Sequence, residues 1–111
     1  MNDESKKWLL DILSSIDSID SYIGEKKIFQ DYEKNKILRR AVEREIQIIR
    51  EAVVRIQKVD PDLILNNARQ IIATRNRIVH AYDAVNNSII WGIVVNHLPA
   101  LRAEVEALLN A

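Results

Sequence analysis

Four side chains able to act together on a phosphodiester lie within one short stretch of the chain: Arg75, Asn76, His80 and Tyr82. An imidazole exchanges protons near neutral pH, so His80 is a candidate general acid or base. The guanidinium of Arg75 offers a permanently charged fork of donors that matches a phosphate. Together the two groups could supply proton transfer and charge stabilisation for attack of a ribose 2′-hydroxyl on the adjacent phosphodiester.

This chemistry needs no metal ion, and the sequence favours none. The chain has no cysteine, and its two histidines, His80 and His97, have no clustered carboxylates beside them. Such a set makes a poor site for zinc or a similar ion. We therefore expect neither a metal nor another cofactor. His97 shares a stripe with apolar residues, so we expect it to be packed or at an interface.

Arg75 stands in an apolar helical stripe, where a hydrophobic residue would be expected. Steps of three and four give this stripe the residues Ile64, Ala68, Ile71, Arg75, Ile78 and Tyr82. A buried, unpaired guanidinium would cost roughly several kcal/mol, so Arg75 must meet a carboxylate, line a wet cleft or face another chain. His80 lies about 140° around the helix from Arg75, so the two can converge only from the flanks of a groove.

A purely structural alternative remains open for the same residues. Arg75 could form an ion pair with Glu45 or Glu51, while His80 and Tyr82 fill one end of the core. Trp8 and Trp91 are interpreted as core anchors. The charged run from Lys34 to Arg55 is most simply a helix facing solvent.

Two long helices are predicted in the first half of the chain. The first ends near Gly24, a suitable C-terminal cap, and the second covers about 35–58. Residues 25–33 could form a short extra helix or an ordered connection. The predicted stripe of the first helix is Trp8, Leu9, Ile12, Leu13, Ile16, Ile19 and Ile23; that of the second is Ile37, Leu38, Ala41, Val42, Glu45, Ile48, Ile49, Ala52, Val53 and Ile56.

Two more helices are predicted in the second half. Asp60 before Pro61 is a good start signal, which places the third helix at about 61–82. The stretch DAVNN should break it, and Asn86 or Asn87 could cap a fourth helix. That helix carries the stripe Ile90, Ile93, Val94, His97, Leu98, Leu101, Val105 and Leu108. Pro99 should kink the fourth helix without ending it, because the apolar period continues on both sides.

Composition agrees with an all-α, up-and-down four-helix bundle formed by a single domain, 1–111. The chain has two glycines, two prolines, 48% hydrophobic and 29% charged residues. Its 16 Lys and Arg balance its 16 Asp and Glu, which excludes a global basic field of the kind that drives nonspecific nucleic-acid binding. No stretch reads as a signal peptide or a membrane span, and we expect a cytoplasmic protein without membrane contact.

The stretch TRNRIVHAYD at 74–83 resembles the HEPN superfamily, and within it the HepT-like toxins. The shared motif is arginine, a polar residue, three further residues, histidine, any residue and tyrosine, which Arg75, Asn76, His80 and Tyr82 fit. The segments LLDIL at 9–13, RAVEREIQIIREA at 40–52 and IIWGIVVNHLPAL at 89–101 also follow the order and spacing of that family. The likeness therefore covers most of the chain.

This resemblance implies a metal-independent endoribonuclease toxin of a toxin–antitoxin system, with Arg75 and His80 catalytic and Asn76 supporting them. It also implies a homodimer in which both copies of the motif line one cleft. The partner would be a minimal nucleotidyltransferase (MntA-like) antitoxin that transfers AMP to Tyr82, so that AMPylation silences the toxin. Arg69 and Arg77 are further candidate RNA contacts, although a solvated charged face explains each equally well.

Two features depart from the family pattern. Where the family has isoleucine-glycine-glutamate-alanine, this chain has Ile49, Arg50, Glu51 and Ala52, so close helix approach at Arg50 is excluded. This arginine could add phosphate affinity or alter the dimer. The connection before the third helix is reduced to VDPDLIL at 59–65. Two other functions stay open: a non-catalytic subunit that binds a nucleotide or substrate for the nucleotidyltransferase, and a structural helical dimer.

Overall fold

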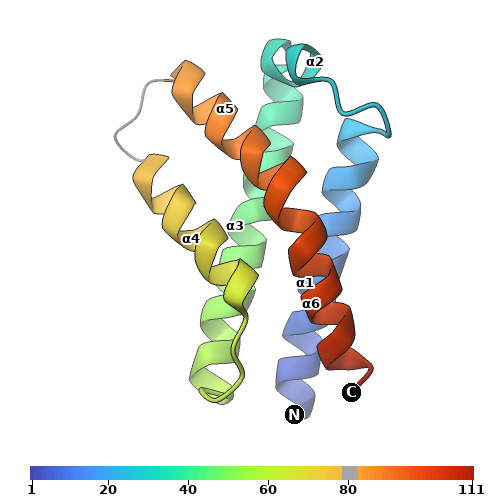
Figure 1. Ribbon diagram of the computed structural model, residues 1–111, viewed down its shortest axis with the longest axis vertical. Coiled ribbons are helices and arrows are strands. Elements are labelled where there is room, and N and C mark those ends of the chain that lie inside the picture. Colours follow the sequence, from blue (N-terminus) through green and yellow to red (C-terminus); the bar gives the residue numbers. More distant parts are fainter. Residues whose placement is uncertain (79–82) are drawn as a thin grey trace.

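The computed structural model describes residues 1–78 and 83–111, and the side chains of residues 1–73 and 87–111. The described residues form helices and no strand, in agreement with the predicted all-α fold. The helical elements, shown in Figure 1, are α1 (Asp3–Ile23), α2 (Phe29–Lys34), α3 (Lys36–Val59), α4 (Asn66–Ile78), α5 (Asp83–Gly92), a π-helical turn (Ile93–His97) and α6 (Leu98–Leu109).

The four long segments run alternately up and down, as predicted. In Figure 1, α1 rises from the N-terminus, α3 descends, α4 rises and α5 continues through the π-helical turn into α6, which descends. Both termini therefore lie at the same end of the molecule, and α2 lies at the opposite end. This arrangement brings the end of α4 and the start of α5 to the end of the bundle away from the termini.

Caps and a glycine define the first two long helices. The side chain of Asn2 accepts a hydrogen bond from the Ser5 N–H at 2.7 Å, and Asn35 accepts one from the Leu38 N–H at 3.0 Å. Gly24 ends α1 with φ of 81°, a conformation that costs glycine little, and its N–H donates to the Asp20 carbonyl at 2.9 Å. The predicted ends of both helices are thus confirmed within one or two residues. The stretch 25–33, predicted as a short helix or an ordered connection, contains the short helix α2, which begins only at Phe29.

The predicted stripes of α1 and α3 form much of the core, with two differences. Ile37, predicted inside, is 83% exposed, whereas Ile46, absent from the predicted stripe, is buried. Ile37 lies roughly 120° around α3 from the buried Ile49, so it falls outside the packed face. The buried hydrophobic residues of these helices are Leu9, Ile12, Ile16 and Ile19 in α1 and Val42, Ile46, Ile49, Ala52, Val53 and Ile56 in α3.

The predicted start of the third helix is wrong by five residues. Asp60 does not cap the start of this helix. It ends α3 instead, where its N–H donates to the Ile56 carbonyl at 2.8 Å. Its carboxylate accepts a hydrogen bond from the Ser5 hydroxyl at 3.4 Å, and its carbonyl accepts one from the Leu63 N–H at 3.0 Å. The bond from Leu63 makes a turn, and α4 begins only at Asn66. Consequently Ile64 is 52% exposed, and Leu65 takes its place in the core. The predicted end of this helix, at 82, lies outside the described residues.

The last segment also differs from prediction at its start and at Pro99. Helix α5 begins at Asp83, so residues 86 and 87 lie inside it and do not cap it. The helix passes Pro99 as predicted, but through a π-helical turn in which the Leu98 N–H donates to the carbonyl of Ile93. Proline has no N–H to donate, and the wider turn immediately before it changes the local hydrogen-bond pattern. The apolar stripe continues through Leu98, Leu101 and Val105, all buried.

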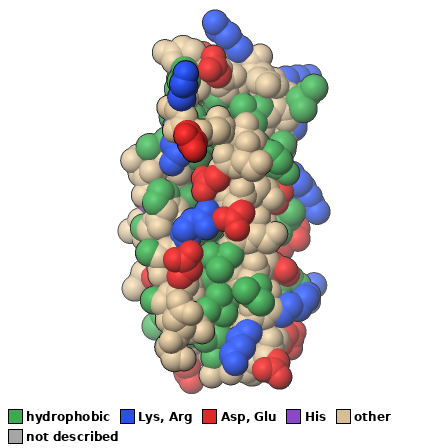
Figure 2. All heavy atoms as spheres, turned by 90° about the vertical axis from the view of Figure 1, so that its right-hand side faces the viewer, with side chains coloured by type: hydrophobic (Ala, Val, Ile, Leu, Met, Phe, Trp, Pro, Cys, Tyr) green, Lys and Arg blue, Asp and Glu red, His purple; other side chains and the backbone are tan. Residues whose placement is uncertain are grey.

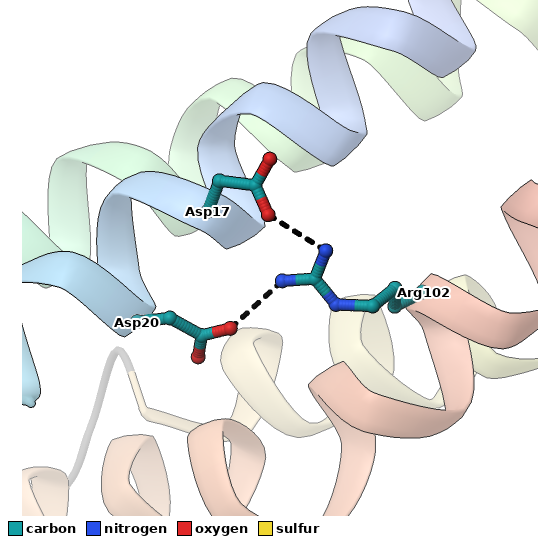
Figure 3. A network of polar contacts seen from close by, with 3 residues as sticks. All are labelled: Asp17, Asp20 and Arg102. Atoms are coloured by element: carbon teal, nitrogen blue, oxygen red, sulfur yellow. Dashed lines mark hydrogen bonds and ion pairs between the residues drawn. The ribbon is translucent and has the colours of Figure 1, made fainter. Parts of the chain in front are cut away.

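An arginine fork joins the last helix to the first. Arg102 on α6 donates to Asp17 at 2.6 Å and to Asp20 at 2.7 Å, two carboxylates one turn apart on α1 (Figure 3). The hydrogen bond to Asp17 is the main cause that raises the pKa of Arg102, which is charged in any case. On this side of the molecule acidic, basic and hydrophobic side chains intermix at the surface (Figure 2). The fork fixes the position of α6 along α1.

An aromatic cluster joins α2 to α5. Phe29 and Tyr32 of α2 lie against Trp91, with ring centroids 5.8 and 5.3 Å away. Tyr32 is 1% exposed, and its hydroxyl has no hydrogen-bond partner among the described residues. Burial is the main cause that raises the pKa of this phenol; Glu43 adds to the rise and Arg39 opposes it. The cluster therefore depends on Tyr32 remaining neutral.

We expect alkaline pH to destabilise the fold through Tyr32. Below a pH of about 10 the phenol is protonated in both states, so its contribution to stability is intact. Above it the unfolded chain releases a proton that the native chain keeps, and the free energy of unfolding falls by up to about 1.4 kcal/mol per pH unit. Denaturant titrations from pH 8 upward should show a smaller alkaline loss for Tyr32→Phe. The exposed Tyr22 gives the control, because Tyr22→Phe should retain the full loss.

Candidate functional site

The predicted catalytic motif spans the end of α4 and the connection to α5. Positions 75, 76 and 77 lie within α4, which ends at Ile78, and the side chains of Arg75, Asn76 and Arg77 lie outside the described part. His80 and Tyr82 lie in the segment 79–82, also outside the described residues. The predicted convergence of Arg75 and His80 and the alternative pairing of Arg75 with Glu45 or Glu51 therefore both stay untested.

The start of α4 is held by a carboxylate from a distant part of the chain. Glu104 on α6 accepts hydrogen bonds from the backbone N–H groups of Asn66 and Asn67, one on each oxygen and both at 3.2 Å. A carboxylate suits this position because the free amides and the helix dipole both favour negative charge. Just beyond this cap, Ala68 and Ile71 are 1% exposed in the core. The cap and the core together set the direction in which α4 leads to the motif.

Loss of the Glu104 carboxylate should loosen α4 while leaving the other helices in place. We expect Glu104→Ala to lower the free energy of unfolding by about 1 kcal/mol, the usual cost of losing a helix cap. Hydrogen exchange should accelerate first at the amides of Asn66 and Asn67. Glu106→Ala makes the same charge change on an exposed face of α6 and serves as the control. Equal exchange at these amides in the two variants would contradict a capping role.

The helix that follows the motif, α5, is held by the aromatic cluster. Trp91, near the end of α5, packs on Phe29 and Tyr32 of α2, and the neighbouring Ile90 is 4% exposed in the core. Helix α5 therefore has a fixed end about two turns beyond its first residue, Asp83. The motif lies between two anchored helices, α4 held by Glu104 and α5 held by Trp91.

Helix α4 separates the candidate RNA-contacting arginines from position 75. Position 75 is one turn beyond the buried Ile71 and so shares the register of the core face. Arg69 and position 77 lie roughly 120° and 160° away from it around the helix. Arg69 is exposed and lines a small cavity of about 30 Å³ with Pro61 and Leu63. A strand of RNA that contacts both Arg69 and position 75 would therefore have to pass around α4. The RNA contacts of Arg69 and Arg77 stay predictions.

Three further observations concern metal-binding groups, an ion pair and membrane-spanning helices. No group of three or more His, Asp or Glu side chains that could hold a metal ion occurs in the part of the chain that the structure describes. Glu51, a predicted alternative partner of Arg75, lies 3.9 Å from Arg44 on its own helix. Within the described ranges no helix combines the length and apolarity needed to cross a membrane.

Sequence reasoning did not identify Glu104 as part of the framework of the site. Nothing local marks it, since the two amides that it caps lie 38 and 37 residues earlier in the chain. The sequence holds one weak signal: Leu65, the residue before α4, has no polar side chain that could cap the helix. A cap supplied across the bundle can be found only from the fold.

Comparisons with known proteins relate most of this chain to proteins named as ribonucleases. The family model described as HepT-like, ribonuclease HepT-like, matches residues 12–108. A protein of Methanocaldococcus jannaschii named as a candidate RNase is 28% identical over 95% of this chain and 87% of its own length. A candidate RNase of Caldanaerobacter subterraneus subsp. tengcongensis is 32% identical over 74% of each chain. A protein of Thermococcus cleftensis named a probable ribonuclease HepT is 29% identical over 97% of this chain and 98% of its own. No solved structure gives a significant match.

Proposed function

The chain belongs to the HepT-like ribonuclease family, and on that premise we propose that it is an endoribonuclease toxin that cuts RNA without a metal ion. The observation that carries the proposal is the complete motif, Arg75, Asn76, His80 and Tyr82, inside the matched region 12–108. The described helices support it by anchoring both flanks of that motif. Relatives named as ribonucleases support the class of reaction.

The proposed reaction is a transesterification within the RNA strand. His80 removes the proton of a ribose 2′-hydroxyl, and the 2′ oxygen attacks the adjacent phosphorus. The bond from phosphorus to the 5′ oxygen breaks, and that oxygen takes a proton from an imidazolium or from water as it leaves. Arg75 donates to the phosphoryl oxygens, on which negative charge increases in the transition state. The products are a 2′,3′-cyclic phosphate and a 5′-hydroxyl end, and Asn76 holds the arginine or histidine in place.

We place this reaction at a homodimer cleft. Position 75 lies in register with the buried Ala68 and Ile71, yet a guanidinium needs a polar partner or water. A cleft between two copies of the chain would give it that environment next to the packed part of α4. Two copies of His80 in one cleft could also divide the work, one removing the 2′ proton and the other protonating the leaving oxygen.

We further propose that a minimal nucleotidyltransferase acts as the antitoxin and transfers AMP from ATP to Tyr82. The phenol oxygen loses its proton and attacks the α-phosphate, and pyrophosphate leaves. Tyr82 lies two residues after His80, so an adenylate there would add bulk and negative charge beside the phosphate site. Both changes would exclude RNA. The antitoxin and the RNA would be met in the cytoplasm, where we place the protein.

The purified chain, incubated with single-stranded RNA in excess EDTA, tests the proposed function. We expect cleavage at an unchanged rate, with 2′,3′-cyclic phosphate and 5′-hydroxyl ends on the fragments. Cleavage that stops in EDTA and returns with a divalent cation would overturn the metal-independent mechanism. Binding of RNA without new ends, in protein shown to be dimeric, would instead favour a non-catalytic partner subunit.

A further inference from the structure

One helix is strongly basic although the chain as a whole is neutral. Helix α3 contains seven Lys or Arg and three Glu, whereas the whole chain has 16 of each sign. Helix α1, its main packing neighbour, is acidic overall. Helix α3 thus carries a net charge of +4, seven cations less three carboxylates, so a local positive field can form along it without a global one.

The cations of α3 divide into two groups. Three have partners: Arg39 donates to the Glu33 carbonyl, Arg40 lies 3.9 Å from Glu43, and Arg44 lies 3.9 Å from Glu51. The other four have no ion pair or hydrogen bond within the described parts of the chain: Lys36, Arg50, Arg55 and Lys58. The charge of an exposed cation without a carboxylate partner is not offset by a neighbouring anion, so the cation can pair with an anionic ligand.

Three of these four cations line one groove. Arg50, Arg55 and Lys58 border a depression of about 350 Å³ between α3 and the first turns of α1, together with Trp8, Glu51 and Val54. All three are exposed. Arg50 and Lys58 are eight residues apart, so they lie about 12 Å apart along the helix axis. The row is long enough to contact more than one phosphate of an extended strand.

The rest of the groove wall is partly apolar. Val54 is 38% exposed, and Trp8 lies half-buried with the Lys7 ammonium 3.9 Å from its ring centroid. The Trp8 indole N–H is buried, so it does not offer a donor to the groove. The three α3 cations are opposed by one carboxylate, Glu51, which also pairs with Arg44. Charge and shape together suit a polyanion with an apolar component, as single-stranded RNA is.

We propose that this groove between α1 and α3 binds the phosphodiester backbone of the RNA substrate, apart from the catalytic motif. The inference rests on the proposed function for the identity of the ligand. Arg50, Arg55 and Lys58 neutralise phosphates and raise the affinity for long RNA, and they take no part in bond breaking. Arg50, the residue that stands where the family pattern has glycine, is one of the three.

Charge reversal of the groove tests the inference by direct binding. The chain carrying His80→Ala, which is expected to cut at least about 100-fold more slowly, is titrated into labelled single-stranded RNA of about 20 nucleotides. We expect Arg50→Glu, Arg55→Glu and Lys58→Glu together to weaken binding at least about 10-fold. The slope of log affinity against log salt should become shallower by about 2, since each lost phosphate contact removes about 0.7. A second triple variant with glutamine at the three positions covers the case in which charge reversal disturbs folding.

Two matched variants separate a local site from an effect of net charge. Lys26→Glu, Lys27→Glu and Lys34→Glu together change the net charge equally at exposed positions near α2, and they should weaken binding less than about 2-fold. Glu51→Gln removes the opposing carboxylate and should tighten binding about 2-fold or more. The inference would be overturned if the glutamate triple in the groove and the glutamate triple near α2 weakened RNA binding equally. It would also be overturned if the glutamate and the glutamine triples in the groove both kept wild-type RNA affinity.

The outcome can be separated from failure of the proposed function. In the chain with His80 intact, the groove triple should raise KM for long RNA and leave kcat unchanged. If wild-type protein cuts RNA but the groove triple has the wild-type KM, the groove inference alone fails. If wild-type protein binds RNA through the groove but produces no new ends, the catalytic proposal alone fails. The groove triple could instead leave RNA affinity unchanged and lose binding to an acidic partner protein. The groove would then be a protein-binding surface, and the inference would be overturned.

Discussion

Replacing His80 with alanine should lower the rate of RNA cleavage by about 10²- to 10⁴-fold, the usual contribution of a general acid–base group. The loss should appear in kcat, because the histidine acts on a proton that moves in the transition state. The other histidine provides a matched control. His97→Gln changes a half-buried residue in the π-helical turn, and cleavage should stay within a few-fold of wild type. A His80→Ala protein that cuts at the wild-type rate would exclude the mechanism.

Arg75→Ala should cause a loss of similar size, and the Arg75→Lys variant should recover only part of it. Lysine keeps the charge, but it cannot donate two parallel hydrogen bonds to a phosphoryl group. The alternative in which Arg75 only forms a structural ion pair predicts something different. In that case Arg75→Ala would lower the thermal midpoint and the dimer fraction together, and Arg75→Lys would restore both. Measurements of unfolding, sedimentation and cleavage on the same protein preparations distinguish the two.

Tyr82→Phe should produce a toxin that its antitoxin can no longer silence. The phenylalanine variant keeps the ring and lacks the oxygen that would accept AMP, so growth arrest should persist when the nucleotidyltransferase is co-expressed. Cells that express the wild-type protein should regain growth under the same conditions, and that protein should gain the mass of one adenylate. The exposed Tyr22 supplies the control, since Tyr22→Phe should still be modified and silenced. Full neutralisation of Tyr82→Phe would place the modification elsewhere or show that the antitoxin acts by binding alone.

The periodic parts of the fold could be predicted because their signals are local. Stripes at three- and four-residue spacing located α1, α3 and most of the final segment, and Asn35 and Gly24 marked ends that the structure confirms. Errors arose where the tertiary structure gave a residue a competing partner or left it outside the packed face. Asp60 looks like a cap in sequence, but its carboxylate accepts from Ser5 on another helix, and Ile37 falls off the packed face although it fits the spacing.

The candidate site also has a part that the sequence predicts and a part that only the structure shows. The identity and spacing of Arg75, Asn76, His80 and Tyr82 are properties of eight consecutive residues, so the sequence suffices to propose the reaction and the family. The contacts that hold the helices on either side of the motif could not be predicted from those eight residues. Glu104 reaches α4 from α6, Trp91 meets Phe29 and Tyr32 from α2, and Arg102 joins α6 to α1.

The sequence alone thus determined the helical class, the apolar faces and the chemistry that the motif can offer, since each depends on residues within a few turns of one another. The tertiary structure decided where α4 begins, how the chain passes Pro99 and which cations of α3 remain unpaired beside α1. These depend on contacts between segments far apart in the chain, whose partners are set only when the helices pack. The basic groove became visible for that reason, because its walls belong to two different helices.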